Sequence, residues 1–153
     1  MAGPGAELAL AGLYLCRSDE TLKLNVTVRH ESGGAVSRQL FKGVAGGSAD
    51  VSFGGLVYVA EGARGTKALQ ENHNILLSTQ ARVESRPQLE IYNDDVECSH
   101  GATSGALDAD ALFYMRSRGI PEPEARRLEI VSFLAPVLER LPEEVSLSII
   151  EGL

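Results

Sequence analysis

Short apolar runs, separated by glycine and polar residues, fill the chain from Glu7 to about Cys98. Apolar and polar residues alternate within these runs, which is the period of a β-strand with one buried face. The clearest runs are Leu8–Leu10, Leu13–Leu15, Leu22–Val28, Gln39–Phe41, Val51–Phe53, Leu56–Val59, Ile75–Leu77 and Gln88–Ile91. Glycines at positions 33, 34, 43, 46, 47, 54, 55, 62 and 65 predict turns between them. Such strands are typical of a sandwich, a barrel or a β-solenoid, and without a clean sequence period all three stay open.

A helical pattern begins after Thr103, where the glycine-rich alternation ends. Asp108 predicts a helix cap, because an aspartate side chain accepts hydrogen bonds from the first free backbone N–H groups of a helix. Gly119 predicts the end of that helix, since glycine readily adopts the left-handed conformation found there.

Two further helices are expected. The first begins between Pro121 and Pro123, and Pro136 either kinks it or ends it near Ala135, because proline lacks a backbone donor. The second begins at Pro142. Apolar residues recur at helical spacing as Leu128, Val131, Leu134, Leu138 and Leu141. The sequence therefore predicts a mainly β unit over residues 1–107 and a small helical domain over residues 108–153.

Composition bears on partners and location. The chain has 153 residues, a net charge of -7 and a pI near 5.0, so no basic face is expected to bind nucleic acid. No stretch approaches the roughly 18 consecutive apolar residues of a membrane span, and no signal peptide is recognisable. We expect a cytoplasmic protein with no membrane contact, in which Cys16 and Cys98 are free thiols.

Cys98 and His100 form the candidate site, because residues two positions apart on a strand share one face. A thiol beside an imidazole is a pair suited to soft metals or to sulfur handling. A buried thiol with a hydrogen-bonded imidazole is the other interpretation of these residues. Two cysteines and three histidines are too few for an ordinary four-thiolate cluster site in one chain.

The remaining polar residues form no comparable motif. His30 and His73 are isolated and lack the spacing of a zinc site. Residues 62–67 are too short for a phosphate-binding loop, so any ATP hydrolysis is expected on a partner. Asn72 and Asn74 share one side of a strand or turn, where we expect them to satisfy backbone groups at a solenoid corner.

Five segments carry a more specific pattern. They are Gln39–Val44, Ala68–Ser78, Arg86–Ile91, Val96–Thr103 and Asp110–Ile120. Together they resemble the SufD type of the SufB/SufD family, the scaffolds of iron-sulfur cluster assembly. The resemblance implies the C-terminal part of a right-handed parallel β-helix, followed by a small α-helical domain. It decides among the β architectures that periodicity leaves open.

The resemblance also implies a function. The chain would be a non-enzymatic scaffold subunit of the SUF complex, pairing with a SufB-type chain and docking a SufC-type ABC ATPase. Cys98 and His100 would contact the nascent cluster or a metal at the heterodimer interface, while Gly101 stands where SufB-type chains have a glutamate. No cluster would stay on this chain alone, and a transient cluster would belong to the complex. The residues expected to bind the ATPase are Leu128, Val131, Leu134 and Leu138.

Two other functions stay open. One is a β-helix enzyme that acts on carbohydrate or transfers acyl groups; acidic residues between positions 90 and 97 supply carboxylates, but hexapeptide repeats are absent. The other is a structural fragment. The chain resembles the later part of the family's β-helix, and an open end of a solenoid favours self-association through its unpaired edge.

Overall fold

Seven strands followed by three helices make up the chain, and the computed structural model describes all of residues 1–153. The strands are β1 (Glu7–Cys16), β2 (Thr21–His30), β3 (Val36–Ala45), β4 (Asp50–Val59), β5 (Thr66–Leu76), β6 (Arg82–Ile91) and β7 (Val96–Gly105). The helices are α1 (Ala109–Ser117), α2 (Glu122–Leu138) and α3 (Glu143–Glu151). Strands account for 46% of the residues.

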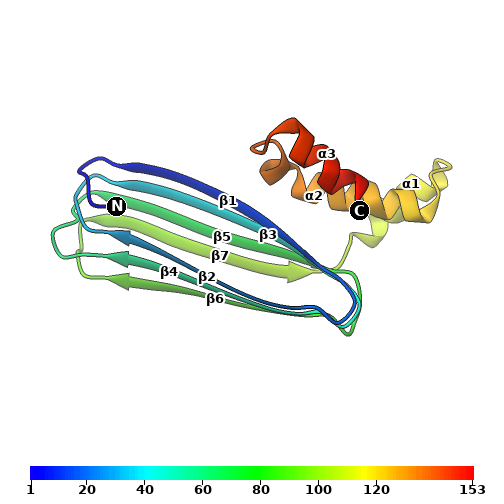
Figure 1. The fold of residues 1–153 in the computed structure, drawn as a ribbon, viewed down its shortest axis with the longest axis horizontal. Helices are drawn as coiled ribbons and strands as arrows, with labels where there is room; N and C mark the ends of the chain where they lie inside the picture. The colour runs from blue at the N-terminus through cyan, green and yellow to red at the C-terminus, as the bar shows by residue number, and fades with distance from the viewer.

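The strands form two facing sheets (Figure 1). Sheet A contains the odd-numbered strands in the order β1-β3-β5-β7, and sheet B contains the even-numbered strands in the order β2-β4-β6. Every pairing is parallel, so the chain alternates between the sheets and coils through about 3 turns. Each coil takes about 30 residues. The expected parallel β-helix followed by helices is confirmed.

The repeat is hidden in the sequence because the spacing between stacked residues changes from coil to coil. Glu7 lies beside Val36, and Val36 lies beside Lys67, but Asp50 lies beside Arg82. The strands are also longer than the apolar runs suggested. In β1 two predicted runs join through Gly12, so that one strand replaces two.

Three glycines expected in turns, Gly43, Gly54 and Gly55, lie inside strands. At Gly43 of β3 an added Cβ would meet the Tyr14 ring and the side-chain oxygen of Asn74. At Gly55 of β4 it would meet the side-chain amide of Gln70. The ladder of paired residues continues through both positions. Glycine therefore provides space for a large neighbour here and does not turn the chain.

The space between the sheets is apolar in the first coils and becomes polar along sheet A. Phe41 and Phe53 pack across it with ring centroids 5.0 Å apart, within a cluster that includes Tyr14 and Val51. The buried polar residues of sheet A are Ser37, Gln39, Thr66, Gln70, Asn72 and Asn74. Such residues are stable inside a protein only when most of their polar atoms form hydrogen bonds.

The helical residues pack on the outer face of sheet A, near the C-terminal ends of β1 and β3 (Figure 1). Leu134 and Leu138 of α2 are buried there with Val44, and Leu13 of β1 packs against the same cluster. The Lys42 ammonium lies 4.2 Å from the centre of the Phe133 ring, which adds a cation–π contact between sheet and helix.

The helix ends follow the sequence signals. The Asp108 side chain accepts hydrogen bonds from two backbone N–H groups of α1, and Gly119 has a φ of 88° just beyond that helix. Glu143, the first residue of α3, directly follows Pro142. Of the two alternatives at Pro136, an end of the helix near Ala135 is excluded, because α2 continues through the proline to Leu138. Burial of the apolar residues on either side stabilises this turn although one backbone hydrogen bond is missing.

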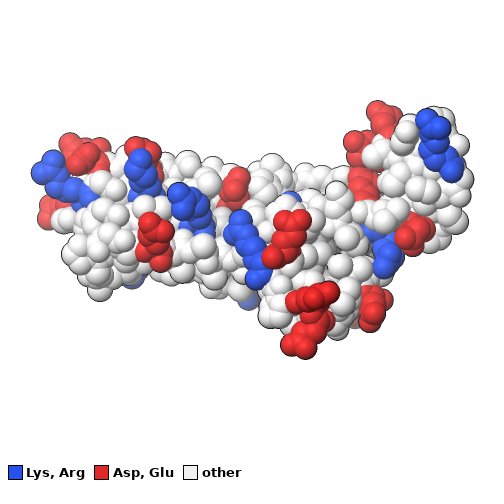
Figure 2. All heavy atoms as spheres, turned by 90° about the horizontal axis from the view of Figure 1, so that it is seen from above, with Lys and Arg blue, Asp and Glu red and all other residues white.

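Charges are mixed along the surface. Seen from above, Lys and Arg alternate with Asp and Glu along the solenoid (Figure 2). Several of these residues pair, as Arg29 does with Glu31 at 2.8 Å. None of the three helices is both long and apolar enough to cross a membrane.

Replacing Gly43 with alanine should destabilise the solenoid by about 1–3 kcal/mol, because the new Cβ would overlap Tyr14 and Asn74 in a packed interior. Gly62→Ala is the matched control, since nothing lies within 4 Å of an added Cβ at that position. Chemical denaturation of both variants measures the difference. Equal stabilities would contradict tight packing of Tyr14 and Asn74 around Gly43.

Candidate functional site

The candidate residues lie on β7, the last strand of sheet A. β7 pairs only with β5, which leaves its other edge without a strand. In this register Cys98 lies beside Ala68 and His100 beside Gln70. Ala68 and Gln70 are buried and the intervening residue is exposed, so both candidates belong to the row that faces the interior. Cys98 and His100 thus share one face, as the sequence predicts.

The two side chains differ in their surroundings. Cys98 is half-buried and packs with Leu89 and Val96 around the Val57 cluster. Burial raises the pKa of the Cys98 thiol, while a hydrogen bond with the backbone of Ala68 lowers it by a smaller amount. The thiol is therefore mostly protonated near neutral pH, which makes it a weak nucleophile. His100, in contrast, is exposed.

This end of the solenoid is open on both sheets. β6 is the edge of sheet B, and β7 is the edge of sheet A. Pro87 lies within β6, and proline has no backbone N–H to offer to a further strand. β7 contains no proline along its ten residues. The edge beside Cys98 and His100 is consequently the better of the two for pairing with another chain.

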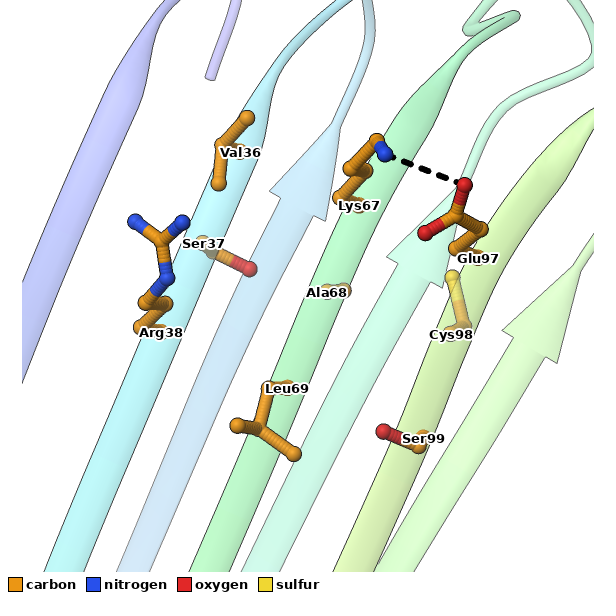
Figure 3. A pocket seen from close by; sticks show the side chains of 9 residues that line it. All are labelled: Val36, Ser37, Arg38, Lys67, Ala68, Leu69, Glu97, Cys98 and Ser99. Carbon is orange, nitrogen blue, oxygen red and sulfur yellow. Dashed lines mark hydrogen bonds and ion pairs between the residues drawn. The ribbon is translucent and has the colours of Figure 1, made fainter.

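A groove of about 310 Å³ crosses the N-terminal ends of β3, β5 and β7 (Figure 3). Its lining includes Cys98, and the Lys67 Nζ to Glu97 Oε1 ion pair of 3.0 Å spans β5 and β7 there. Arg38 and Leu69 lie on the neighbouring strands.

A second polar group lies on the outer face of sheet A. His73 Nδ1 is 2.8 Å from Thr103 Oγ1, and His73 Nε2 is 3.6 Å from Glu71 Oε1. Lys42 lies beside His73 in the register; burial lowers the pKa of Lys42, and the Glu71 carboxylate partly offsets this. The sequence indicated an isolated histidine. Thr103 and Lys42 come from strands about 30 residues away, which local spacing does not reveal, whereas Glu71 lies on the same strand.

The interior amides are a further feature that local sequence reasoning missed. Asn72 Nδ2 donates to Tyr14 Oη at 3.2 Å, and Asn74 Nδ2 donates to Asn72 Oδ1 at 2.9 Å. Tyr14 Oη donates to Asn74 Oδ1. Both asparagines face the same side, as expected, but they lie within β5 and not at a corner. The regular spacing of polar residues at positions 70, 72 and 74 was the available signal.

The four residues of α2 that were predicted to bind the ATPase do not share one exposed face. They are Leu128, Val131, Leu134 and Leu138. Leu134 and Leu138 are buried, because α2 uses them to pack against sheet A, whereas Leu128 is 39% exposed. Val131 lines a groove of about 370 Å³ together with residues of α3. The full lining of this α2–α3 groove is Val131, Ala135, Leu138, Glu139, Leu141, Glu143, Ser146 and Ile150.

Metal ligands are sparse. No three His, Cys, Asp or Glu side chains of the chain lie close enough together to hold a metal ion. Cys98 and His100 offer two soft donors, whereas zinc sites and iron-sulfur clusters use four protein ligands in their usual form.

Comparison with known proteins identifies the family. A model described as "SUF system FeS cluster assembly, SufBD core domain" matches residues 1–133, which include all seven strands. The chain belongs to the SufBD family. Residues 1–133 of this SufBD chain also include α1 and most of α2.

Relatives within the SufBD family agree with this assignment. The iron-sulfur cluster assembly protein SufD of Escherichia coli is 38% identical over 142 residues, covering 93% of this chain and 34% of the relative. SufD of Bacillus subtilis is 38% identical over 128 residues, covering 84% and 29%. A SufBD family protein of Synechocystis is 40% identical over 133 residues, covering 87% and 28%. The predicted SufD-type membership is confirmed, and the chain spans about a third of the relatives' length.

Cys98 should react slowly with iodoacetamide near pH 7.5, because its raised pKa leaves little thiolate. The measurement uses a Cys16→Ser background, so that one thiol is followed. The rate should keep rising with pH beyond the ordinary thiol pKa of about 8.5.

A matched control carries Ser99→Cys with Cys98→Ser in the same background. Residue 99 is exposed on the other face of β7, so alkylation there should be several-fold faster at the same pH. Equal rates at the two positions would contradict the burial of Cys98.

Proposed function

We propose that this SufD-type chain acts as a non-enzymatic scaffold in iron-sulfur cluster assembly. The observation that supports this most directly is the open edge of β7, which carries Cys98 and His100 on its inner row. A strand edge with unpaired backbone groups binds another strand readily. A SufB-type chain that pairs with β7 would bring its own side chains next to the two candidates.

The number of ligands fits a shared site. Cys98 and His100 supply two soft donors, and the other donors of a cluster would come from the SufB-type partner. The iron-sulfur cluster is cargo in this scheme and leaves for an acceptor protein. In the free chain burial raises the pKa of the Cys98 thiol, and because the thiolate is the form that binds a metal or accepts sulfur, Cys98 would have to lose its proton before taking either role.

The helical residues provide a second surface. The α2–α3 groove has an apolar lining from Val131, Leu141 and Ile150, with Glu139 and Glu143 among its other residues. Grooves of this kind accept an apolar anchor from a partner. We assign docking of the SufC-type ATPase to this groove and to the exposed Leu128.

Pairing through β7 is tested with Ala102→Glu. Ala102 belongs to the inner row of β7 and is exposed in the free chain, so a carboxylate is tolerated there until a partner strand covers it. Binding to a purified SufB-type chain, measured by titration calorimetry, should weaken by about tenfold or more, or roughly 1.4 kcal/mol.

Ser99→Glu is the matched control, because it places the same charge on the exposed outer row of β7. Its affinity should change by less than about threefold. Equal losses in the two variants would argue against edge pairing, and a wild-type chain that binds only itself would favour the structural-fragment alternative.

Docking of the ATPase is tested with Val131→Asp, which places a charge in the α2–α3 groove. Affinity for a SufC-type ATPase should fall by about tenfold or more if this residue contacts an apolar anchor. Val145→Asp makes the same change on α3 at an exposed position outside the groove lining, and should bind normally. Unchanged binding of a folded Val131→Asp variant would place the docking surface elsewhere.

A further inference from the structure

An arginine and two tyrosines form a stack along sheet B, with one residue from each coil. Arg29 of β2 lies beside Tyr58 of β4 in the register, and its guanidinium carbon is 3.8 Å from the centre of the Tyr58 ring. The next ring is that of Tyr92, whose centroid lies 5.4 Å from that of Tyr58 at an interplanar angle of 49°. A planar cation is attracted to the face of an aromatic ring in such a stack.

Tyr92 is the last member of this stack. It directly follows β6, the edge strand of sheet B, and its backbone N–H donates to the Val59 carbonyl at 3.0 Å. Tyr92 is 58% exposed, so much of its ring stays open although Tyr58 packs against it. The open part of the ring is available to another molecule.

A groove of about 710 Å³, the Tyr92 groove, adjoins this exposed ring. Its lining is Glu61, Ile91, Tyr92, Asn93 and Asp94. Asn93 Nδ2 donates to the backbone carbonyl of Glu61 in the preceding coil, and Asn93 Oδ1 accepts from the Asp95 backbone N–H at 2.9 Å. These bonds hold the turn in place before any ligand arrives, which lowers the entropic cost of binding.

The lining of the Tyr92 groove is acidic and contains no lysine or arginine. Glu61 and Asp94 are exposed, and neither belongs to any of the ion pairs of the chain. Arg64, which follows Glu61 in the same turn, is already paired with Asp95 at 3.4 Å. Two unpaired carboxylates beside an aromatic ring favour a cationic ligand.

We propose that the Tyr92 groove binds an arginine side chain of a partner protein, with the guanidinium on the Tyr92 ring and the carboxylate of Glu61 or Asp94 as its ion-pair partner. The chain itself contains this arrangement one coil earlier, where Arg29 lies on the Tyr58 ring and pairs with Glu31 at 2.8 Å. Arginine is favoured over lysine because a guanidinium is planar, is more weakly hydrated and can form two parallel hydrogen bonds with a carboxylate.

The place of the Tyr92 groove indicates which partner supplies the arginine. Sheet B ends at β6, where Pro87 has no backbone N–H for another strand. A side chain anchored in the groove holds a partner at this end of sheet B without backbone pairing. Under the proposed function, on which this identity rests, the partner is the SufB-type chain that pairs with β7. The preference for arginine is a property of this chain alone.

The preference is tested with three capped tripeptides that carry arginine, lysine or citrulline between two glycines. Citrulline keeps the planar head group of arginine but is uncharged. NMR of the Ile91 methyl groups in the full chain follows binding, because Ile91 lines the groove. The arginine peptide should bind about threefold more tightly than the lysine peptide and about tenfold more tightly than the citrulline peptide. Equal affinities for the arginine peptide and either of the others, or no saturable shift at Ile91, would overturn the proposal.

Tyr92→Leu removes the ring and keeps an apolar side chain at an exposed position, so its affinity for the arginine peptide should fall to that for the citrulline peptide. Tyr114→Leu is the matched control, because Tyr114 is 59% exposed on α1 and lies outside the groove lining. It should bind the arginine peptide as the wild type does. Equal affinities of the two variants would contradict a site at Tyr92.

Titration calorimetry with a purified SufB-type chain separates this inference from the proposed function. Tyr92→Leu should weaken binding by about fivefold or more, and Tyr114→Leu by less than about twofold. A loss caused by Ala102→Glu but not by Tyr92→Leu would keep the edge pairing and reject the Tyr92 groove as part of that interface. A loss caused by Tyr92→Leu but not by Ala102→Glu would support the groove and reject pairing through β7.

Discussion

Parallel pairing in register is the constraint on which the rest of this structure depends. Each residue of one coil lies directly beside a residue of the next, so side chains meet in rows and must fit as rows. Gly43 provides space for Tyr14 and Asn74 in its own row. Gly55 of sheet B provides space for the Gln70 amide, which reaches across from sheet A. A change of size at one position is therefore felt in the neighbouring coils.

The same constraint creates the candidate site. Ala68 and Gln70 belong to an inner row of β5 that β7 covers. Cys98 and His100 continue this row on β7, where no further strand covers them. Cys98 is half-buried against the cluster that contains Val57 and Ala68, while His100 is exposed. The site consequently arises where a regular stack ends, and its chemistry comes from interior positions that have become accessible.

Much of this architecture could be predicted from the sequence, and the limits have physical causes. The alternation of apolar and polar residues identified the strands, and Asp108 and Gly119 identified the two ends of α1. The resemblance to the SufB/SufD family identified the β-helix. The turn assignment at Gly43 was wrong because a glycine inside a strand and a glycine in a turn look alike locally. Thr103, the hydrogen-bond partner of His73, lies one coil away, so only the register reveals it.

The helical residues illustrate the same limit on another scale. The apolar spacing of α2 predicted a helix correctly, but it did not tell which residues face sheet A and which face outward. Leu134 is buried against the sheet, whereas Leu128 is partly exposed on the same helix. Apolar residues at helical spacing show that a helix has an apolar face. Which of them are buried and which stay exposed depends on what the helix packs against.

The proline within β6 has a consequence for how the two sheets can be extended at this end. A solenoid that ended in two bare strands could add chain after chain, because each addition would present a fresh edge. Pro87 denies a backbone donor on sheet B, so growth by both sheets together is hindered at this end. A strand that is added at this end therefore has its full set of backbone partners on sheet A alone, along β7.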